Sequence, residues 1–415
     1  MTRKTIRQRQ LLAVLNLIRE EGPISKVDIS RKLRIRPATI DFLLKELEEK
    51  GLIKNDGKPI LTNNRGRKPM AIELNKEAHY AVGVHFSDIS IYFVVADLKG
   101  NIIREYKTDA RNIKSKEDLV VKILDGIKYL LKVKKIRKEK VLGIGLGIPG
   151  SVDLERGLSL SYHFYPWWRE IPFRDIVEEK FPLFLILDND TRTFTLAERD
   201  YDSGKGVKNF LFLDLGILGI GLGIILNGEL YYGKSGKAGE FGHITIEENG
   251  PLCTCGNYGC LESLCSGVAM EKEAKKLVAQ GVATVLKEKE EITYPEIFKA
   301  VRLGDKIALQ IVDRLGQHLG IGISTLINIF NPALVILGGY LAREGGDLLL
   351  PVVERTVKLR ALPEPRSETV IKISHLPENS GALGAATLVL NRFFAEGESQ
   401  VSEKILGLPL NGRNF

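Results

Sequence analysis

The sequence predicts an α/β protein in which a small, mostly helical N-terminal module precedes a larger body. Over the first 50 residues, apolar side chains recur at the spacing of amphipathic helices. From Tyr80 onward, short apolar runs typical of buried strands alternate with helical stretches. A chain of 415 residues also exceeds what one hydrophobic core usually organises. We therefore expect two or three domains, the first of them at residues 1–75.

Three helices and a hairpin are predicted within this first domain. One helix spans residues 8–20, and a second spans 26–33 behind Ser25, a residue type preferred at helix N-caps. A third spans 37–50 and begins with a proline, which suits the first helical position. Residues 52–74 would form the hairpin, so the order is that of a winged helix-turn-helix. The apolar residues available for its core are Ile24, Ile29, Leu33, Ile40, Leu43, Leu44 and Leu47.

The excess positive charge of the chain lies entirely in its N-terminal part. Residues 1–80 contain 18 Lys and Arg against 10 Asp and Glu, and the rest of the chain contains 42 of each. A basic module on a neutral body indicates a polyanion as the partner of the module alone. A dimerisation module is the alternative for three such helices, and the basic excess argues against it.

Two groups of residues are the candidate DNA contacts. The start of the second helix of a helix-turn-helix meets base edges in the major groove, which gives Arg34, Arg36, Ala38 and Thr39 by position. Asp41 follows them and is expected to be a solvent-facing charge at the helix start. Arginines are also favoured in narrow minor grooves, and the hairpin supplies Arg65, Arg67 and Lys68. A flexible charged linker is the alternative for that basic segment.

The body, residues 76–398, alternates strands and helices. The predicted strands cover residues 81–84, 91–96, 141–146, 183–187, 210–213 and 334–337. The predicted helices cover residues 116–132, 193–200, 269–279 and 306–328. The tail, residues 399–415, lacks a clear period.

Four potential metal ligands fall within eighteen residues of the body. They are His243, Cys253, Cys255 and Cys260. Three thiolates and one imidazole are the ligand set of a closed, tetrahedral, structural zinc, which leaves no position for a catalytic water. The alternative is four unrelated buried side chains, but the chain has only four Cys and six His, so chance clustering is disfavoured. We predict a structural Zn²⁺.

No membrane segment is predicted. The most apolar window, residues 210–226, contains Asp214 and four glycines and reads as a buried strand followed by a glycine turn. The apolar run at residues 11–18 lacks the cleavage site of a signal peptide and leads directly into charged residues. We therefore expect a cytoplasmic protein.

The segment around the cysteines resembles the signature of the ROK family, which contains sugar kinases and sugar-responsive repressors. It reads Gly-Glu-x-Gly-His from Gly239, followed by Cys-x-Cys-Gly-x-x-Gly-Cys-Leu-Glu ending at Glu262. The resemblance to further motifs of the family extends to residues 145–153, to residues 189–190, and to residues 331–332 with 338–339. The resemblance implies a two-lobed, actin-like ATPase fold with ribonuclease H-like cores. Its small lobe would comprise about residues 76–190 and the C-terminal helix, and its large lobe about residues 191–380.

The resemblance also implies a sugar site between the lobes. Its hydroxyl contacts would be Asn189, Asp190, Glu240, His243 and Glu262. Carboxylates and amides are suitable partners for vicinal hydroxyls, and a zinc-bound imidazole can offer its second nitrogen to the ligand. In the kinases of the family the aspartate at position 190 would be the general base.

The phosphate side departs from the pattern of the kinases. Kinases of the family carry Asp-x-Gly-Gly-Thr after the first strand, where this chain has residues 85–89, His-Phe-Ser-Asp-Ile. In the second phosphate loop, Leu218 stands where kinases have threonine. Asp88 would repel a triphosphate, so ATP and Mg²⁺ are not expected as cofactors.

The sequence thus predicts a ROK-type regulator, in the repressor branch, that binds operator DNA and a sugar and has no catalytic residues. We expect a homodimer or homotetramer, since operators are bound as paired half-sites. An ATP-dependent sugar kinase is the alternative function, and a sugar-binding protein without a role on DNA is a third.

Overall fold

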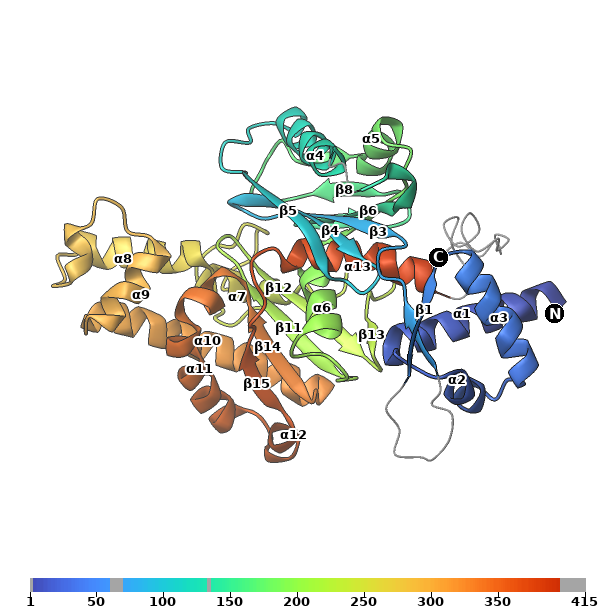
Figure 1. The fold of residues 1–415 in the computed structure, drawn as a ribbon. Coiled ribbons are helices and arrows are strands. Elements are labelled where there is room, and N and C mark those ends of the chain that lie inside the picture. The colour runs from blue at the N-terminus through green and yellow to red at the C-terminus, as the bar shows by residue number, and fades with distance from the viewer. Residues whose placement is uncertain (1–2, 60–69, 133–135, 396–415) are drawn as a thin grey trace.

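The computed structural model describes residues 3–59, 70–132 and 136–395. The predicted DNA contacts Arg65, Arg67 and Lys68, and the tail at residues 399–415, lie outside these described residues. Within them the chain forms an N-terminal module and a two-lobed body, joined by a C-terminal helix (Figure 1).

The N-terminal module is a winged helix-turn-helix, as predicted. It contains α1 (Arg3–Glu21), α2 (Lys26–Leu33), α3 (Pro37–Glu49) and the antiparallel pair β1 (Ile53–Pro59) and β2 (Met70–Leu74). The Ser25 hydroxyl accepts a hydrogen bond from the Asp28 N–H at 3.1 Å and so caps α2. The predicted core is buried, except that Leu33 is half-buried.

Helix α1 begins five residues before the predicted start. The Arg7 guanidinium pairs with Glu46 of α3 at 2.5 Å and lies 4.5 Å from the centre of the Phe42 ring. These are contacts of a polar residue with another helix, so a search for apolar periodicity cannot find them.

The small lobe is built on a five-stranded sheet of order β10-β6-β3-β4-β5. Its strands are β3 (Tyr80–Phe86), β4 (Ser90–Asp97), β5 (Ile102–Asp109), β6 (Val141–Ile148) and β10 (Leu185–Asn189). Its helices are α4 (Lys116–Leu131), α5 (Phe173–Lys180) and the short turn η1 (Lys138–Lys140). A three-stranded sheet lies beside it, made of β7 (Ser151–Asp153), β8 (Leu158–Ser161) and β9 (Arg169–Ile171).

The large lobe contains a second five-stranded sheet, of order β13-β12-β11-β14-β15. Its strands are β11 (Phe210–Leu215), β12 (Ile220–Leu226), β13 (Glu229–Leu230), β14 (Leu334–Gly338) and β15 (Val370–Ile373). The helices of this half of the chain are α6 (Asp190–Tyr201), η2 (Phe241–His243), α7 (Leu261–Cys265), α8 (Gly267–Ala279), η3 (Val285–Glu288), α9 (Tyr294–Arg302), α10 (Lys306–Phe330), α11 (Gly339–Arg360) and α12 (Pro363–Glu368).

The two sheets share one topology. In each, the first strand pairs antiparallel with the second and parallel with the fourth, and the fourth pairs parallel with the fifth. The turn between β3 and β4 in one lobe therefore corresponds to the turn between β11 and β12 in the other. This duplicated ribonuclease H-like architecture confirms the predicted fold class, and the buried strand and glycine turn expected at residues 210–226 are β11, its turn and β12.

Helix α13 (Ser380–Phe394) joins the body to the N-terminal module. It returns to the small lobe and packs on β3, β6 and α6, and a Cβ atom on Gly145 of β6 would lie 1.8 Å from the Ala385 carbonyl oxygen. At its far end, Asn16 of α1 donates to the Phe394 carbonyl at 3.0 Å, and the Arg19 guanidinium lies 4.3 Å from the centre of the Phe394 ring. The apolar residues of the module and of α13 form one continuous core.

Candidate functional site

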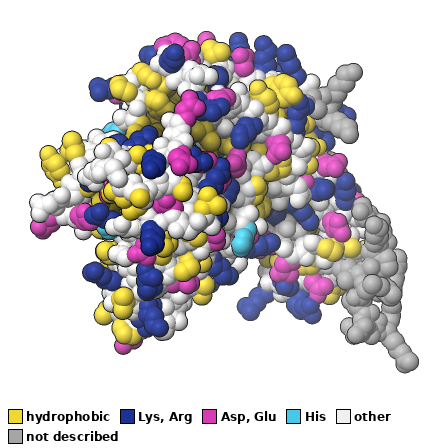
Figure 2. Space-filling model, turned by 90° about the vertical axis from the view of Figure 1, so that its left-hand side faces the viewer, with side chains coloured by type: hydrophobic (Ala, Val, Ile, Leu, Met, Phe, Trp, Pro, Cys, Tyr) yellow, Lys and Arg dark blue, Asp and Glu magenta, His cyan; other side chains and the backbone are white. Residues whose placement is uncertain are grey.

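A cavity of about 480 Å³ lies between the two lobes. Figure 2 shows the molecule hollowed there, with hydrophobic side chains exposed around the hollow. All five residues predicted to contact a sugar line this cavity, namely Asn189, Asp190, Glu240, His243 and Glu262. They come from separate parts of the chain and converge because the ends of β10 and β12, η2 and α7 meet at the cleft.

Asn189 and Asp190 lie where β10 ends and α6 begins. The Asn189 amide oxygen caps α6 by accepting from the Arg192 N–H at 3.3 Å, and its amide nitrogen donates to the Gly150 carbonyl at 3.2 Å. This cap starts α6 three residues earlier than predicted. Burial raises the pKa of Asp190 to about 7, which places a strong acceptor for a hydroxyl proton at the cavity wall.

A buried ion pair ties this corner to the loop that carries Glu240. The Arg192 and Asp188 side chains are 2.6 Å apart, and both are nearly inaccessible to solvent. Arg192 also donates to the Gly236 carbonyl at 3.0 Å, and the Tyr232 hydroxyl donates to Asp188 at 3.0 Å. Glu240 follows a few residues later, so its loop is fixed from the side of α6.

Glu262 is the most buried of the five hydroxyl contacts that were predicted. Its carboxylate accepts from the Ile220 N–H at 3.3 Å and from the Thr254 hydroxyl at 3.4 Å. Burial raises its pKa, and His243 opposes that rise. Glu262 thus connects the glycine turn before β12 with the cysteine loop.

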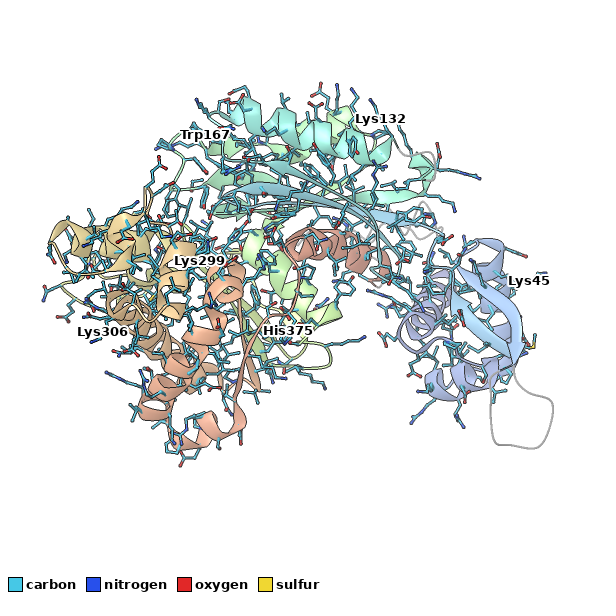
Figure 3. All side chains as sticks on the ribbon, turned by 60° about the vertical axis from the view of Figure 1, so that its left-hand side comes forward. Lys45, Lys132, Trp167, Lys299, Lys306 and His375 are labelled. Atoms are coloured by element: carbon cyan, nitrogen blue, oxygen red, sulfur yellow. The ribbon has the colours of Figure 1, made fainter. Side chains whose placement is uncertain are left out.

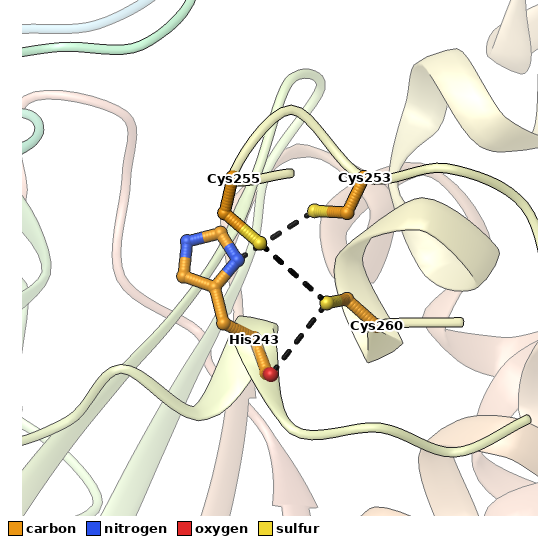
Figure 4. A group of neighbouring side chains, drawn as sticks. All are labelled: His243, Cys253, Cys255 and Cys260. Atoms are coloured by element: carbon orange, nitrogen blue, oxygen red, sulfur yellow. Dashed lines mark hydrogen bonds between the residues drawn. The ribbon is translucent and has the colours of Figure 1, made fainter. Parts of the chain in front are cut away.

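The cysteine loop forms the predicted metal cluster (Figure 4). The ligand atoms of His243, Cys253, Cys255 and Cys260 all lie within 4.8 Å of one another. The Sγ atoms of Cys255 and Cys260 are 3.7 Å apart, and Cys253 Sγ is 3.7 Å from His243 Nδ1. Zn–S bonds of about 2.3 Å give a tetrahedron with S···S edges of roughly 3.8 Å, so the spacing fits a closed four-ligand site.

The backbone of the loop explains how near neighbours reach one point. Gly259 has a φ of +63°, and a Cβ atom there would lie 1.6 Å from the Glu247 carbonyl oxygen. Cys265, the remaining cysteine of the chain, lies outside the cluster and is fully buried, with its Sγ 3.6 Å from the Leu315 carbonyl.

The phosphate side of the cleft differs from an open anion cradle. Asp88, in the turn between β3 and β4, accepts from the Tyr162 hydroxyl at 2.8 Å and from the Leu218 N–H at 3.3 Å. The turns of the two lobes that correspond to the phosphate loops of the kinases are therefore joined to each other. Ser87, which precedes Asp88, shares a hydrogen bond of 2.9 Å with Tyr340 and so adds a second contact between the small and the large lobe.

His85 is a core residue. It is buried beneath α13, its ring contacts Phe194 edge-on at 4.6 Å, and burial lowers its pKa to about 3. The segment that replaces the first phosphate motif thus contributes packing and a lobe-to-lobe contact.

Several residues of the cavity wall were not singled out from the sequence. Asp214, at the end of β11, has its pKa raised to about 8, chiefly by burial and then by Asp190. Tyr340 and Arg343 of α11 line the cavity on the same side. The aromatic residues 162–164 also line it. A run of aromatic side chains was the signal that could have identified this segment.

The predicted major-groove contacts that the structure describes lie at the turn between α2 and α3 and in the first turn of α3. Arg34 is the C-cap of α2, and Arg36 is the N-cap of α3. Ala38 is exposed and Thr39 is half-buried, both in the first turn of α3. Asp41 is exposed, as expected, and it also pairs with Lys26 of α2.

Comparison with known proteins identifies the family. The ROK family model matches residues 81–392 of this chain, and a model of winged helix-turn-helix DNA-binding domains matches residues 7–54. The chain belongs to the ROK family. The sequence-based assignment is therefore confirmed.

Two of the similar curated proteins are repressors of nearly the same length. The xylose repressor of Caldicellulosiruptor bescii is 31% identical over 93% of this chain and 96% of its own. The N-acetylglucosamine repressor of Escherichia coli O157:H7 is 29% identical over 92% of this chain and 93% of its own.

Two similar solved structures, a regulator and a kinase, differ in how much of this chain they cover. A ROK family transcriptional regulator, a homologue of the Escherichia coli Mlc protein, is 26% identical, has a TM-score of 0.83, and covers 97% of this chain and 100% of its own. A ROK family glucokinase from Streptomyces griseus, in complex with glucose and AMPPNP, is 29% identical, has a TM-score of 0.66, and covers 74% of this chain and 98% of its own. The regulator therefore matches the N-terminal module as well as the body. Across the described ranges, the structure contains no helix that meets the length and hydropathy needed to cross a membrane.

Proposed function

We propose that this protein is a sugar-responsive transcriptional repressor that binds operator DNA through its N-terminal module and a sugar in the cleft between its lobes. The observation that carries the proposal is the combination, in one chain, of a winged helix-turn-helix with a cleft that all five predicted hydroxyl contacts line and with two turns, at the positions of the kinase phosphate loops, that are joined by Asp88. The repressors to which it is similar support the same function. Such a protein acts in the cytoplasm, where its operator is.

Helix α13 supplies the route between the two sites. Its first turn lies at the cleft, where Gly381 packs on His85, and the preceding Glu378 bonds Lys107 of β5 at 2.8 Å and approaches Arg343 of α11 at 3.5 Å. Its last turn packs on α1 through Phe394. A sugar that changes the angle between the lobes therefore shifts α13, and with it the module.

The same geometry argues against phosphoryl transfer. A kinase of this fold needs free backbone N–H groups at its phosphate loops, whereas the Leu218 N–H already donates to Asp88. In this proposal Asp190 binds a sugar hydroxyl and is not a general base. An ATP-dependent sugar kinase remains the alternative, because Asp190 keeps the position of that base.

A structural zinc and a dimer complete the proposal. Bound by His243 and the three cysteines, Zn²⁺ would fix the loop whose Thr254 and Cys253 contact Glu262. Because Nδ1 of His243 faces the thiols, Nε2 is left for the ligand in the cleft. Two copies of the module would read the paired half-sites of an operator.

The test is DNA binding with and without sugar. Fluorescence anisotropy with the DNA upstream of the protein's own gene, across a panel of sugars, should show specific binding and a change of affinity with one of them. Asp190→Asn is the matched variant, and it should keep DNA binding but lose the response. Equal affinity for specific and random DNA, or sugar-dependent ADP release by the wild type at rates of about 1–100 per second, would contradict the proposal.

A further inference from the structure

An aromatic segment stands beside the sugar cleft between β8 and β9. Residues 162–168 read Tyr-His-Phe-Tyr-Pro-Trp-Trp, and the two tryptophans are the only ones in the chain. Figure 3 places Trp167 at the end of the small lobe that lies over the large lobe. The hydroxyl contacts and the joined phosphate loops leave most of this segment without a role.

The segment is rigidly packed. Trp168 is buried, donates from its indole nitrogen to Ser159 Oγ at 2.6 Å, and meets Phe86 edge-on at 5.2 Å between ring centres. The Trp167 ring stacks on Trp168 at 5.6 Å, and Tyr165 lies 5.2 Å from Trp167. Ring pairs at these distances stabilise each other beyond the area that they bury, so the rings form a preformed platform.

Two members of this platform, Tyr165 and Trp168, lie at the wall of a second cavity of about 550 Å³, and Trp167 packs against both of them. Ser161, Tyr162 and His163 line both this cavity and the sugar cleft, so the two adjoin. Tyr162 and Tyr165, both half-buried, contribute aromatic surface to the second cavity, and the buried Trp168 only borders it. The exposed Arg169 and Glu170 contribute charged groups. Glu170 has a positive φ of 45°, a costly conformation for a residue other than glycine.

We propose that the second cavity binds a further sugar ring, so that the effector is a glycoside of at least two rings. This inference rests on the proposed sugar-responsive function and names its ligand class. A pyranose presents C–H groups on its faces and hydroxyls at its edge, and a site with aromatic walls and a few charged groups matches both. A monosaccharide within reach of Asp190 and Glu262 would leave this cavity to solvent. A glycosidic extension past Tyr162 and His163 would enter it.

The position of both tryptophans provides a direct assay. Tryptophan emission reports on this segment alone, so the protein is titrated with each sugar while its tryptophan emission is recorded. The compared pairs are xylose and xylobiose, glucose and either cellobiose or maltose, and N-acetylglucosamine and its β-1,4 dimer. One disaccharide should change the emission and bind at least about tenfold tighter than its monosaccharide, equivalent to roughly 1.4 kcal/mol. Tyr165→Ala should remove that advantage while leaving monosaccharide affinity unchanged. Tyr129→Ala, an exposed tyrosine on α4, is the matched control and should change neither affinity.

The outcomes separate the two proposals. If a monosaccharide binds and alters DNA affinity but no disaccharide binds more tightly, the proposed second ring site is contradicted. The proposed sugar-responsive function is then supported. An advantage of the disaccharide that persists in Tyr165→Ala also contradicts the site. If no saccharide of the panel binds or alters DNA affinity, both this inference and the sugar-responsive function are contradicted.

Discussion

Replacement of Cys255 by serine tests the role of the metal cluster with little change to the packing around it. Cys253 and Cys260 are buried, whereas Cys255 is exposed, so Cys255→Ser removes one ligand with the least disturbance of the core. A closed site of four ligands that loses one thiolate binds zinc much more weakly. We expect the metal content to fall well below one ion per chain.

The effect on sugar binding follows from the contacts of Glu262. Its carboxylate accepts a hydrogen bond from the Thr254 hydroxyl of the cysteine loop at 3.4 Å. Loss of this hydrogen bond costs about 0.5–1.5 kcal/mol. The dissociation constant for sugar should therefore rise about twofold to tenfold.

Elemental analysis gives the metal content, and isothermal titration calorimetry gives sugar affinity on the same samples. Cys265→Ala is the matched control, because it removes a buried thiol outside the cluster. That variant should keep both metal and sugar affinity. The reasoning is refuted if the wild type binds sugar with unchanged affinity after its metal has been removed, or if it is purified without metal and binds sugar fully.

Three further predictions concern the DNA module, the cleft and the helix between them. Arg36→Ala should weaken binding to the operator by about 1–3 kcal/mol and bind random DNA nearly as before, measured by anisotropy on both DNAs. Asp190→Asn should raise the sugar dissociation constant at least tenfold at about 1.5–3 kcal/mol, without changing DNA affinity in the absence of sugar. Since burial raises the pKa of Asp190 to about 7 and a sugar hydroxyl favours its ionised form, wild-type affinity should fall as the pH drops below 7, and Asp190→Asn should lack this dependence. The sign for unliganded stability is opposite, because a raised carboxyl pKa stabilises the native protein at low pH and this contribution is lost as the pH rises through 7. Arg19→Ala removes a contact of about 0.5–1 kcal/mol with the Phe394 ring. This variant should keep its sugar affinity but show a smaller sugar-dependent change in DNA affinity. If that change is as large as in the wild type, this contact does not carry the coupling.

The parts of the site that could be predicted are those held by short stretches of sequence. The four metal ligands lie within eighteen residues, so a few tight turns suffice to bring them together, and the spacing alone indicates the cluster. The same holds for the cap at Ser25, where the capping side chain and the N–H that it accepts from are three residues apart.

The parts that could not be predicted depend on residues far apart in the chain. Asp88 and Leu218 are separated by 130 positions, and their hydrogen bond requires both sheets to be folded and closed on each other. Phe394 and Asn16 are separated by 378 positions, so nothing local indicates that the last helix completes the core of the first. Periodicity also missed the polar start of α1, where Arg7 pairs with Glu46.

The sequence by itself predicted the basic winged helix-turn-helix, the four candidate metal ligands, the candidate hydroxyl contacts through the family motifs, and the departure from the phosphate motif of the kinases. These are properties of composition and local spacing, and residue types carry them without a fold. Only the tertiary structure decided that Asp88 closes the phosphate loops, that α13 joins the cleft to the DNA module, and that an aromatic cavity adjoins the cleft. Each of these is a contact between segments that the two duplicated sheets bring together, and the surfaces that meet exist only once both lobes have folded.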